Sequence, residues 1–354
     1  MKSLPGIKIP VILAAAILLS GCRDKVDKVV DKAVDSMADA VASAVDSDVF
    51  PEYLPSDPIA PTVDELIESG EIESEIPEEK EDDHAKPSHI GSKPADDDIQ
   101  LSTFGMMRYS YSQLNEEERE LYREIYMVLY NHTEEVTLAS KDADEADKVF
   151  QLVMNDHPEI FYVTGYSMNK YMQGDTTMYI EFTGTYDKTK EEEEEARHYI
   201  DDYVDKCLAG MPQSDKDYDK VKYVYEYIIE HTEYDLNAED NQNILSVFST
   251  GRTVCQGYAK ATQYILNEMG IPCLLITGVV KGGEPHAWNM AYVDGHWTYI
   301  DTTWGDASYR NISTGDTWNE ISYEYLCVGE KEFSTTHHEN TMIPLPKAVG
   351  RKKK

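Results

Sequence analysis

The sequence has few basic residues. Lysine and arginine together number 32 among 354 residues, against 67 aspartates and glutamates, and the formal net charge at pH 7 is −35. Nucleic acids are bound mainly through positive side chains that contact phosphates, so this charge balance excludes a nucleic-acid-binding function. An acidic surface is compatible with cationic substrates or metal ions, but its simplest consequence is solubility.

Long apolar runs are also scarce. The most apolar stretch, residues 9–19, follows Lys2 and Lys8 near the N-terminus and is short for a membrane span. Residues 19–22 then read Leu-Ser-Gly-Cys, which resembles a bacterial lipobox. The resemblance implies cleavage before Cys22 and lipid attachment to it, so the mature chain would be anchored at the outer face of a membrane without spanning it. A plain signal peptide is the alternative.

Motifs typical of metal sites are missing. The sequence contains neither Cys-x-x-Cys nor His-Glu-x-x-His. His337 and His338 are adjacent and cannot easily share one ligand site. The segment 235–240 begins like a calcium loop but lacks the glycine and the final glutamate that such a loop needs. We therefore expect no metal and no cofactor.

Cysteine is rare, with five residues in the chain. Cys22 is assigned to lipid attachment. Cys255 is assigned a separate role because it begins a predicted helix, which is described below. Cys207, Cys273 and Cys327 lie in a helix end and two strand-like runs, where cysteine is usually a small buried apolar residue. One disulfide among these three is compatible with an oxidising compartment, but their spacing does not require it.

Composition and periodicity divide the chain into six segments. Residues 1–21 are the signal peptide, and residues 22–49 carry an apolar stripe opposite aspartates and lysines, which we interpret as a helical stalk. Residues 50–100 are acidic, contain several prolines and lack periodicity, so we expect a disordered tether. The remaining segments are an α+β leader domain (101–212), a catalytic domain (213–335) and a C-terminal tail (336–354).

The leader segment alternates helical and strand-like patterns. Asn115, with Glu118 three residues later, has the pattern of a capping box and begins a predicted helix. We find no chemical motif here and expect the tyrosines and His157 to serve packing and capping. The other predicted elements are helices over 144–155 and 191–208, a strand over 159–163, and a hairpin formed by 167–171 and 176–186.

The catalytic segment centres on a predicted helix that begins at Cys255. Apolar residues recur with helical period after Val254, and we expect Thr253 to cap the helix and Gly270 to end it. In the first turn, unpaired N–H groups and the helix dipole favour the thiolate, which is the reactive form of cysteine. Around this helix we predict a helix ending near Thr232, an apolar element over 244–248, a strand over 273–280, a loop over 304–318 and a final strand over 323–328.

A hairpin supplies the two other candidate residues. Strand-like runs over 286–293 and 296–301 flank an Asp-Gly pair, a strong signal for a two-residue turn. In that register His286 and Asp301 are diagonal neighbours on one face, with their Cβ atoms roughly 7 Å or less apart. An imidazole and a carboxylate can close that gap. We expect this face, which also carries Trp288 and other aromatic residues, to pack on the cysteine helix.

Three sequence blocks resemble the motifs of the transglutaminase-like superfamily, in its bacterial exported branch. They read Cys-Gln-Gly-Tyr-Ala-Lys-Ala, His-Ala-Trp-Asn and Asp-Thr-Thr-Trp-Gly-Asp, and they begin at Cys255, His286 and Asp301. The resemblance covers about residues 215–330, and residues 155–163 resemble the leader domain of that branch. It implies an α+β, papain-like core in which a cysteine helix packs on an antiparallel sheet, with these three residues as the catalytic triad. The superfamily includes proteases, cross-linking enzymes, amide hydrolases and inactive members, so the motifs specify fold more closely than reaction.

The chemistry that the triad implies is nucleophilic acyl transfer. Cys255 attacks a carboxamide or peptide carbonyl, His286 protonates the departing amine, and Asp301 orients the imidazole. The backbone N–H of Cys255 can donate to the oxyanion. Candidates for a second donor or for the lining of the cleft are Tyr234, Asn243, Gln256 and Trp304.

The acyl acceptor decides the reaction. Water gives a protease or amidase, which we favour because the sequence shows no calcium-dependent activation machinery. A lysine amine would give a protein cross-linking transglutaminase. A non-catalytic surface module that binds peptides or cell-wall polymer is the third alternative. The expected partners are protein or peptide substrates and cell-envelope components, and we expect a monomer.

Overall fold

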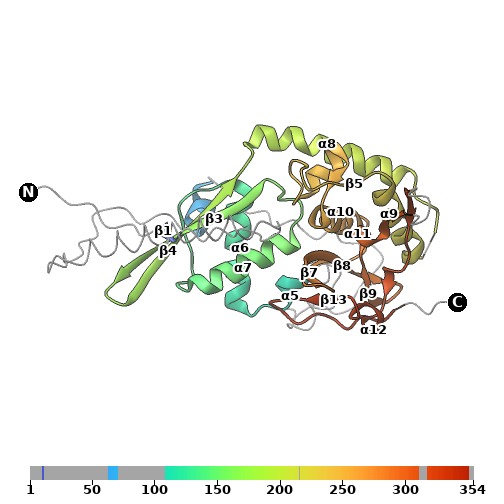
Figure 1. Cartoon of the computed structure of the whole chain (residues 1–354). Helices are drawn as coiled ribbons and strands as arrows, with labels where there is room; N and C mark the ends of the chain where they lie inside the picture. The colour runs from blue at the N-terminus through green and yellow to red at the C-terminus, as the bar shows by residue number, and fades with distance from the viewer. Residues whose placement is uncertain (1–9, 12–62, 71–107, 215, 311–316, 351–354) are drawn as a thin grey trace, which may run out of the picture.

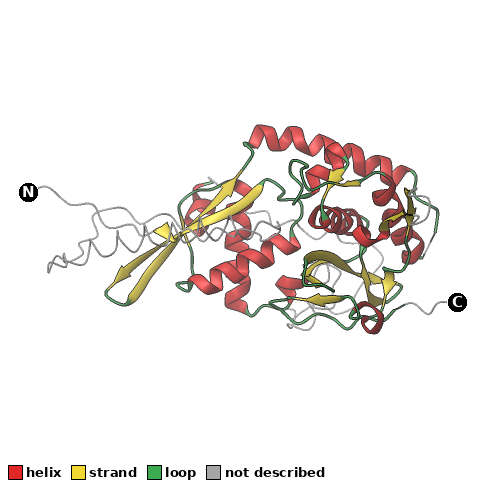
Figure 2. Cartoon of the chain, viewed as in Figure 1, coloured by secondary structure: helices red, strands yellow, loops and turns green. Residues whose placement is uncertain are grey.

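The computed structural model describes residues 10–11, 63–70, 108–214, 216–310 and 317–350. Helices and strands alternate along the chain and build an α+β molecule, as predicted (Figure 2). The stalk with Cys22, and the signal peptide apart from the two-residue strand β1 (Pro10–Val11), lie outside the described residues. No described helix combines the length and the apolar character that crossing a membrane requires.

The leader domain combines helices with a long hairpin that projects from the body of the molecule (Figure 1). Helix α6 (Glu116–Asn131) begins with the predicted capping box: the Glu118 N–H donates to Asn115 Oδ1, and the Asn115 N–H donates to the Glu118 carboxylate, both at 3.0 Å. The hairpin consists of β3 (Val163–Gln173) and β4 (Thr176–Tyr186). The sheet has the order β1-β3-β4-β2, and the remaining elements are α5 (Tyr109–Ser112), β2 (Val136–Thr137) and α7 (Ala143–Asp156).

Two segments before and within this domain differ from the prediction. Residues 159–162, expected to be part of a strand, form turns instead, and β3 begins only at Val163. In these turns the N–H groups of Ile160 and Val163 each donate to the carbonyl three residues earlier. Helix α2 (Val63–Ser69) lies inside the predicted disordered tether. Val63 and Leu66 are one helical turn apart and both are buried against the leader domain, so this short apolar pair finds a partner surface.

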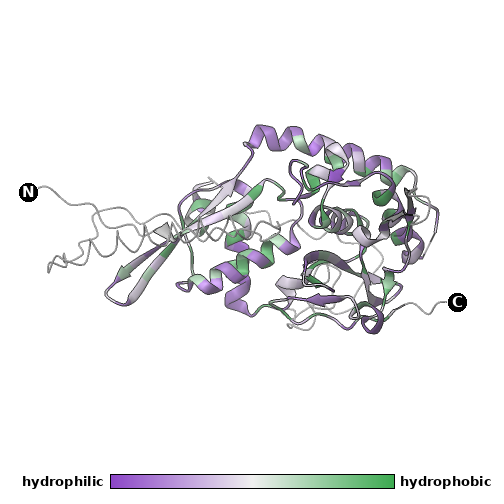
Figure 3. Ribbon diagram, in the orientation of Figure 1, coloured by the Kyte–Doolittle hydropathy of each residue, from purple (hydrophilic) through white to green (hydrophobic). Residues whose placement is uncertain are grey.

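Helix α8 (Lys190–Ala209) links the leader domain to the rest of the chain. Most of it is hydrophilic, as Figure 3 shows at the top of the view, and a stripe at helical spacing faces the core and ends with Cys207. Cys207, Cys273 and Cys327 are buried and form no disulfide within the described residues, as expected for structural cysteines. Burial raises the pKa of Cys207 to about 12, so its thiol is not a nucleophile at neutral pH.

The second part of the molecule, here called the C-terminal domain (residues 216–350), packs helix α10 on an antiparallel sheet. The helix covers Cys255–Glu268, and the sheet has the order β12-β9-β8-β7-β13. Its central hairpin, β8 (Pro285–Val293) and β9 (His296–Ile300), has the predicted two-residue turn. The remaining elements are α9 (Asp217–Glu230), β5 (Glu233–Tyr234), the π-helix η1 (Ser246–Thr250), β6 (Arg252–Thr253), β7 (Cys273–Val280), α11 (Thr302–Gly305), β10 (Asp306–Arg310), β11 (Thr317–Ile321), β12 (Leu326–Val328), α12 (Glu330–Phe333) and β13 (His337–Glu339).

Two predicted irregular segments are partly ordered as strands. The predicted loop over 304–318 contains the end of α11 and most of the hairpin of β10 and β11, in which Tyr309 pairs with Trp318. The predicted tail, 336–354, contributes β13, which pairs with the outer edge of β7. An edge strand leaves a row of backbone N–H and C=O groups unpaired, and the tail satisfies them.

The cysteine helix packs on the opposite face of the hairpin from the one predicted. Cys255 and Ala259 of α10 contact Ala287, and Asn289 Nδ2 donates to the Ala259 carbonyl at 2.9 Å. The aromatic face, with Trp288, is covered by Phe333 and other residues of the C-terminal segment. Small side chains let a helix approach a sheet closely, whereas the large aromatic side chains leave space that the C-terminal segment fills.

Candidate active site

Helix α10 starts without a capping side chain, and Cys255 is its first residue. The N-cap residue is Val254, which offers no side-chain hydrogen bond. Thr253, predicted to be the cap, instead donates from Oγ1 to the Asn241 carbonyl at 2.9 Å and accepts from Ser246 Oγ at 2.7 Å. The prediction for Thr253 was wrong because its hydroxyl is used in packing the preceding loop. The dipole at this helix end favours a negative charge on the Cys255 sulfur.

Gly257 explains why the helix can begin so close to this loop. A Cβ atom at position 257 would lie 1.9 Å from Thr253 Oγ1 and 3.2 Å from the Asn241 carbonyl oxygen. Only a residue without a side chain fits this close approach. The glycine two residues after Cys255 therefore fixes how the first turn of α10 lies against β6.

His286 and Asp301 form a buried pair at the end of the β8–β9 hairpin. His286 Nε2 lies 2.9 Å from Asp301 Oδ2, and the exposed fractions of the two side chains are 7% and 0%. Asp301 is also the N-cap of α11, where its Oδ1 accepts from the Trp304 N–H at 3.0 Å. Both oxygens of the carboxylate therefore accept hydrogen bonds. The register of the hairpin predicts that Asp301 lies next to His286.

Cys255 completes the group, because its side chain interacts with His286 and contributes to the pKa of that imidazole. Because Nε2 of His286 faces Asp301, Nδ1 is the ring nitrogen available to the sulfur. Burial alone would lower the pKa of His286, but the hydrogen bonds and charges of Asp301 and Cys255 raise it to about 9. The imidazole is therefore held in its protonated form at neutral pH.

Asp301 remains ionised although it is fully buried. Burial would raise the pKa of its carboxyl group, but hydrogen bonds from His286 and His337, the charge of His286 and the Trp304 N–H hold that pKa below its ordinary value. An ionised carboxylate facing an imidazolium is the arrangement that fixes the orientation of a catalytic histidine.

The sequence alone did not indicate that His337 lies beside Asp301. Its Nε2 lies 3.0 Å from Asp301 Oδ2, and its side chain is fully buried. The prediction placed it in a tail, whereas pairing of β13 with β7 buries His337 and leaves its neighbour His338 exposed. Successive side chains of a strand point to opposite faces, which explains why one histidine is buried and the other exposed. This pattern can be applied only once the segment is known to be a strand.

The same side chains are the possible metal ligands in the described part of the chain. Potential ligand atoms of His286, Asp301 and His337 lie within 4.8 Å of one another. Both histidines direct Nε2 at the same carboxylate oxygen, and all three residues are buried. An ion would displace the hydrogen bond that orients His286, so the hydrogen-bonded group explains this geometry better than a metal centre does.

Two of the four other candidates lie beside the triad. Tyr234 ends β5, which pairs in parallel with β6 directly before α10, and its hydroxyl interacts with the backbone of Cys255. Partial burial and the charge of Cys255 raise the pKa of Tyr234. The ring of Trp304 lies 5.8 Å from that of His286, centroid to centroid. Both positions suit a residue that lines the cleft.

Asn243 and Gln256 are not brought to the sulfur by any contact in the described residues. Asn243 Oδ1 accepts from the Leu245 N–H at 2.8 Å, so its amide serves the turn before η1. The Gln256 side chain is buried, and its Oε1 atom has no hydrogen-bond partner among the described residues. Tyr234 is therefore the better candidate for the second oxyanion donor.

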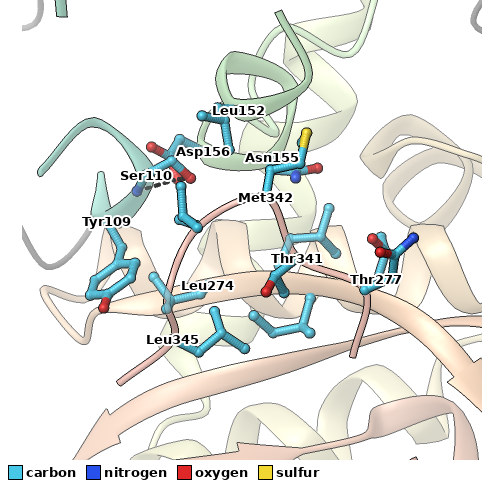
Figure 4. A pocket seen from close by; sticks show the side chains of 14 residues that line it. Tyr109, Ser110, Leu152, Asn155, Asp156, Leu274, Thr277, Thr341, Met342 and Leu345 are labelled. Atoms are coloured by element: carbon cyan, nitrogen blue, oxygen red, sulfur yellow. Dashed lines mark hydrogen bonds between the residues drawn. The ribbon is translucent and has the colours of Figure 1, made fainter. Parts of the chain in front are cut away.

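The pocket in Figure 4 lies between the leader domain and the C-terminal domain, where it borders β7 and the segment that follows β13. It is lined by residues such as Tyr109 and Asp156 on one side and Leu274 and Met342 on the other, and its volume is about 40 Å³. That volume holds only a few water molecules. None of Cys255, His286 and Asp301 lines it, so it is separate from this group of residues.

Residues 206–302 match the model of the transglutaminase-like superfamily, and this segment contains all three residues of the group. The chain therefore carries a transglutaminase-like domain. This finding confirms the family that the three motif blocks indicate.

Two curated relatives match a similar share of the chain. The chain is 29% identical to the kyphoscoliosis peptidase of Homo sapiens over 147 residues, which cover 37% of this chain and 22% of that protein. It is 31% identical to the kyphoscoliosis peptidase of Mus musculus over 132 residues, which cover 33% of this chain and 20% of that protein. The chain thus spans about a fifth of the length of the curated relatives it matches.

Two solved structures are also similar. A TGase crystal structure aligns with a TM-score of 0.30 and 21% identity, covering 43% of this chain and 48% of that chain. A candidate cysteine protease from Cytophaga hutchinsonii aligns with a TM-score of 0.27 and 14% identity, covering 38% of this chain and 61% of that chain.

Proposed function

We propose that this protein is a cysteine acyl-transfer enzyme that hydrolyses peptide or carboxamide bonds through Cys255, His286 and Asp301. The observation that carries the proposal is the buried 2.9 Å hydrogen bond between His286 and Asp301, on an imidazole that also interacts with the side chain of Cys255. A protonated imidazole between a carboxylate and a sulfur at a helix start is the arrangement that activates a thiol.

The reaction proceeds in two acyl-transfer steps. The Cys255 thiolate attacks the carbonyl carbon, and the tetrahedral intermediate breaks its C–N bond while His286 gives its proton to the departing amine, which leaves a thioester. Water then attacks the thioester, with His286 as the base, and the acid departs as the thiolate and imidazolium are restored. We infer that the Cys255 N–H and the Tyr234 hydroxyl, which interacts with the backbone of Cys255, stabilise the oxyanion when it forms.

Water is proposed as the acceptor because both curated relatives are named as peptidases. The same thioester would react with a lysine amine in a cross-linking enzyme. The test is to incubate the full chain with a peptide library, with and without a primary amine, and to read the products by mass spectrometry.

Hydrolysis predicts cleaved or deamidated peptides that do not require the amine, and no products with Cys255→Ser. Products that all carry the added amine would replace hydrolysis with cross-linking. Peptides that bind but remain unchanged in both samples would instead support a non-catalytic binding module and contradict the proposal.

We also propose that the mature protein is attached to the outer face of a membrane through lipid on Cys22, and that its substrates are peptides of the cell envelope. The support is the run of residues 1–22, with its basic start, apolar core and Leu-Ser-Gly-Cys end.

A further inference from the structure

Asp301 lies between two histidines, and the proposed reaction uses only one of them. Oδ2 of Asp301 is 2.9 Å from Nε2 of His286 and 3.0 Å from Nε2 of His337. All three side chains are buried. The second histidine comes from β13, which lies 35 residues beyond the end of the family match at residue 302.

The chemistry of the carboxylate fixes the role of His337 Nε2. An ionised carboxylate can only accept hydrogen bonds, so Nε2 must carry a hydrogen toward Oδ2. The other ring nitrogen, Nδ1, is 2.8 Å from Thr336 Oγ1, which can donate to a neutral ring or accept from a protonated one. In either charge state the Nε2–H remains directed at Asp301.

Aromatic packing holds this imidazole in place. Phe333 stacks on it with a centroid distance of 4.0 Å, and the rings of Trp304 and Trp288 lie at 4.6 and 5.0 Å. These rings leave the imidazole fully buried, so no bulk water can replace its hydrogen bond to the carboxylate. Trp304 also lies next to His286, and the two histidine rings are 5.6 Å apart.

We propose that His337 is a positioning residue that holds the Asp301 carboxylate ionised and aimed at His286. The inference rests on the proposed function, because it assigns His337 to the support of the same triad. It also makes the C-terminal segment, outside the family match, a necessary part of the active site. Apolar residues of this segment, such as Phe333, cover the aromatic face of the sheet, and His337 donates to Asp301.

Among the described residues, the other titratable groups that interact with this carboxylate or with the tyrosines beside it include phenols, a thiol and the carboxyl group of Asp306. Tyr225 of α9 interacts with Asp301 and Cys327, and Tyr325 interacts with Asp301. Burial raises the pKa of both tyrosines, so they remain neutral over the pH range of the test. A change in the acidic pH profile that His337→Phe makes and His338→Phe does not make therefore reports on the group around Asp301.

The experiment measures the rate of Cys255 alkylation by iodoacetamide between pH 4 and 9 in the full chain, by mass spectrometry of the peptide that contains Cys255. His337→Phe keeps an aromatic ring but removes the donor, and His337→Gln restores an N–H near the position of Nε2. His338→Phe is the matched control, because it makes the same change at the exposed neighbour on the same strand. Thermal melting of each variant reports whether the fold is retained.

The expected result is that His337→Phe lowers the alkylation rate at pH 6 about ten- to a hundredfold and moves the acidic edge of the profile to higher pH. The edge moves because a carboxylate that has lost a donor takes up a proton more readily. His337→Gln should recover most of the rate, and His338→Phe should match the wild type. With a cleaved peptide as substrate, kcat should fall while KM is retained.

Three outcomes overturn the inference or the proposal beneath it, and they can be told apart. Fast alkylation at pH 6 in the wild type, with an identical profile for His337→Phe, overturns the role of His337 and leaves the proposed function intact. Equal losses in the Phe and Gln variants, with unchanged melting, overturn the donor role. Slow alkylation in the wild type overturns the proposed function itself.

Discussion

At the scale of single residues, Asp301 sets the charge of His286. Its carboxylate is the main reason why the pKa of His286 rises to about 9 against the effect of burial. Because the proposed mechanism requires a protonated His286 to donate to the leaving amine, we predict that kcat/KM falls as the pH rises through about 9. In Asp301→Asn the charge that holds the proton is lost, so this basic limb should move down toward or below neutral pH.

The measurement is kcat/KM against pH for the wild type and Asp301→Asn, with a peptide that the wild type cleaves. A basic limb that stays at the same pH in both proteins would mean that Asp301 does not control the imidazole. Melting temperatures measured beside the rates separate this effect from loss of the fold.

Tyr234 is the residue whose role in oxyanion binding can be tested directly. Its hydroxyl lies at the backbone of Cys255, where the oxyanion would form, and half of its side chain is exposed. We predict that Tyr234→Phe lowers kcat about tenfold with little change in KM, because a partly exposed donor contributes less than a buried one. An unchanged kcat would leave the Cys255 N–H as the donor and remove Tyr234 from the mechanism. Trp304→Phe tests the neighbouring wall of the cleft in the same assay.

At the scale of elements, one asparagine fastens the cysteine helix to the sheet. Asn289 Nδ2 donates to the carbonyls of Ala259 in α10 and Leu274 in β7, at 2.9 and 3.1 Å, and the side chain is fully buried. We predict that Asn289→Ala lowers the free energy of unfolding by about 2 kcal/mol. The melting temperature should fall by about 4 to 8 °C.

The control is Asn237→Ala, which removes the same side chain at an exposed position of a loop and should leave the melting temperature unchanged. Equal melting temperatures for the two variants would contradict the role assigned to Asn289. A loss of alkylation at Cys255 in Asn289→Ala alone would further indicate that helix position controls the nucleophile.

Local signals predicted many of the elements. The capping box of Asn115 and Glu118, the Asp-Gly turn of the β8–β9 hairpin and the strand Cys273–Val280 are each determined by neighbouring residues, and all are present. The Asp-Gly turn predicts that His286 lies beside Asp301, because the register of a tight hairpin depends on neighbouring residues.

What the sequence did not predict depends on distant partners. The segment with His337 becomes a strand only because β7 presents a free edge, and the aromatic face of the hairpin is covered by Phe333 because that segment folds back. In the same way, Val63 and Leu66 order only against the leader domain. None of these contacts leaves a periodic pattern long enough to identify in isolation.

At the scale of the whole molecule, the proposed location follows from the first 22 residues. If Cys22 carries lipid, the protein expressed in a bacterial host should incorporate labelled palmitate and sediment with membranes, and Cys22→Ala should abolish both. Labelling and sedimentation that persist in Cys22→Ala would contradict the anchor, and Cys207→Ala, at a buried structural cysteine, is the matched control.

The most direct test of the account is the reaction of Cys255 with iodoacetamide at pH 6, followed by mass spectrometry, in the wild type and in His286→Ala. An ordinary thiol is almost fully protonated at that pH, because its pKa is about 8.5. The account predicts rapid labelling of Cys255 in the wild type and labelling slowed at least tenfold in His286→Ala, whose sulfur has lost its imidazolium partner. Slow labelling at the same rate in both proteins would contradict it.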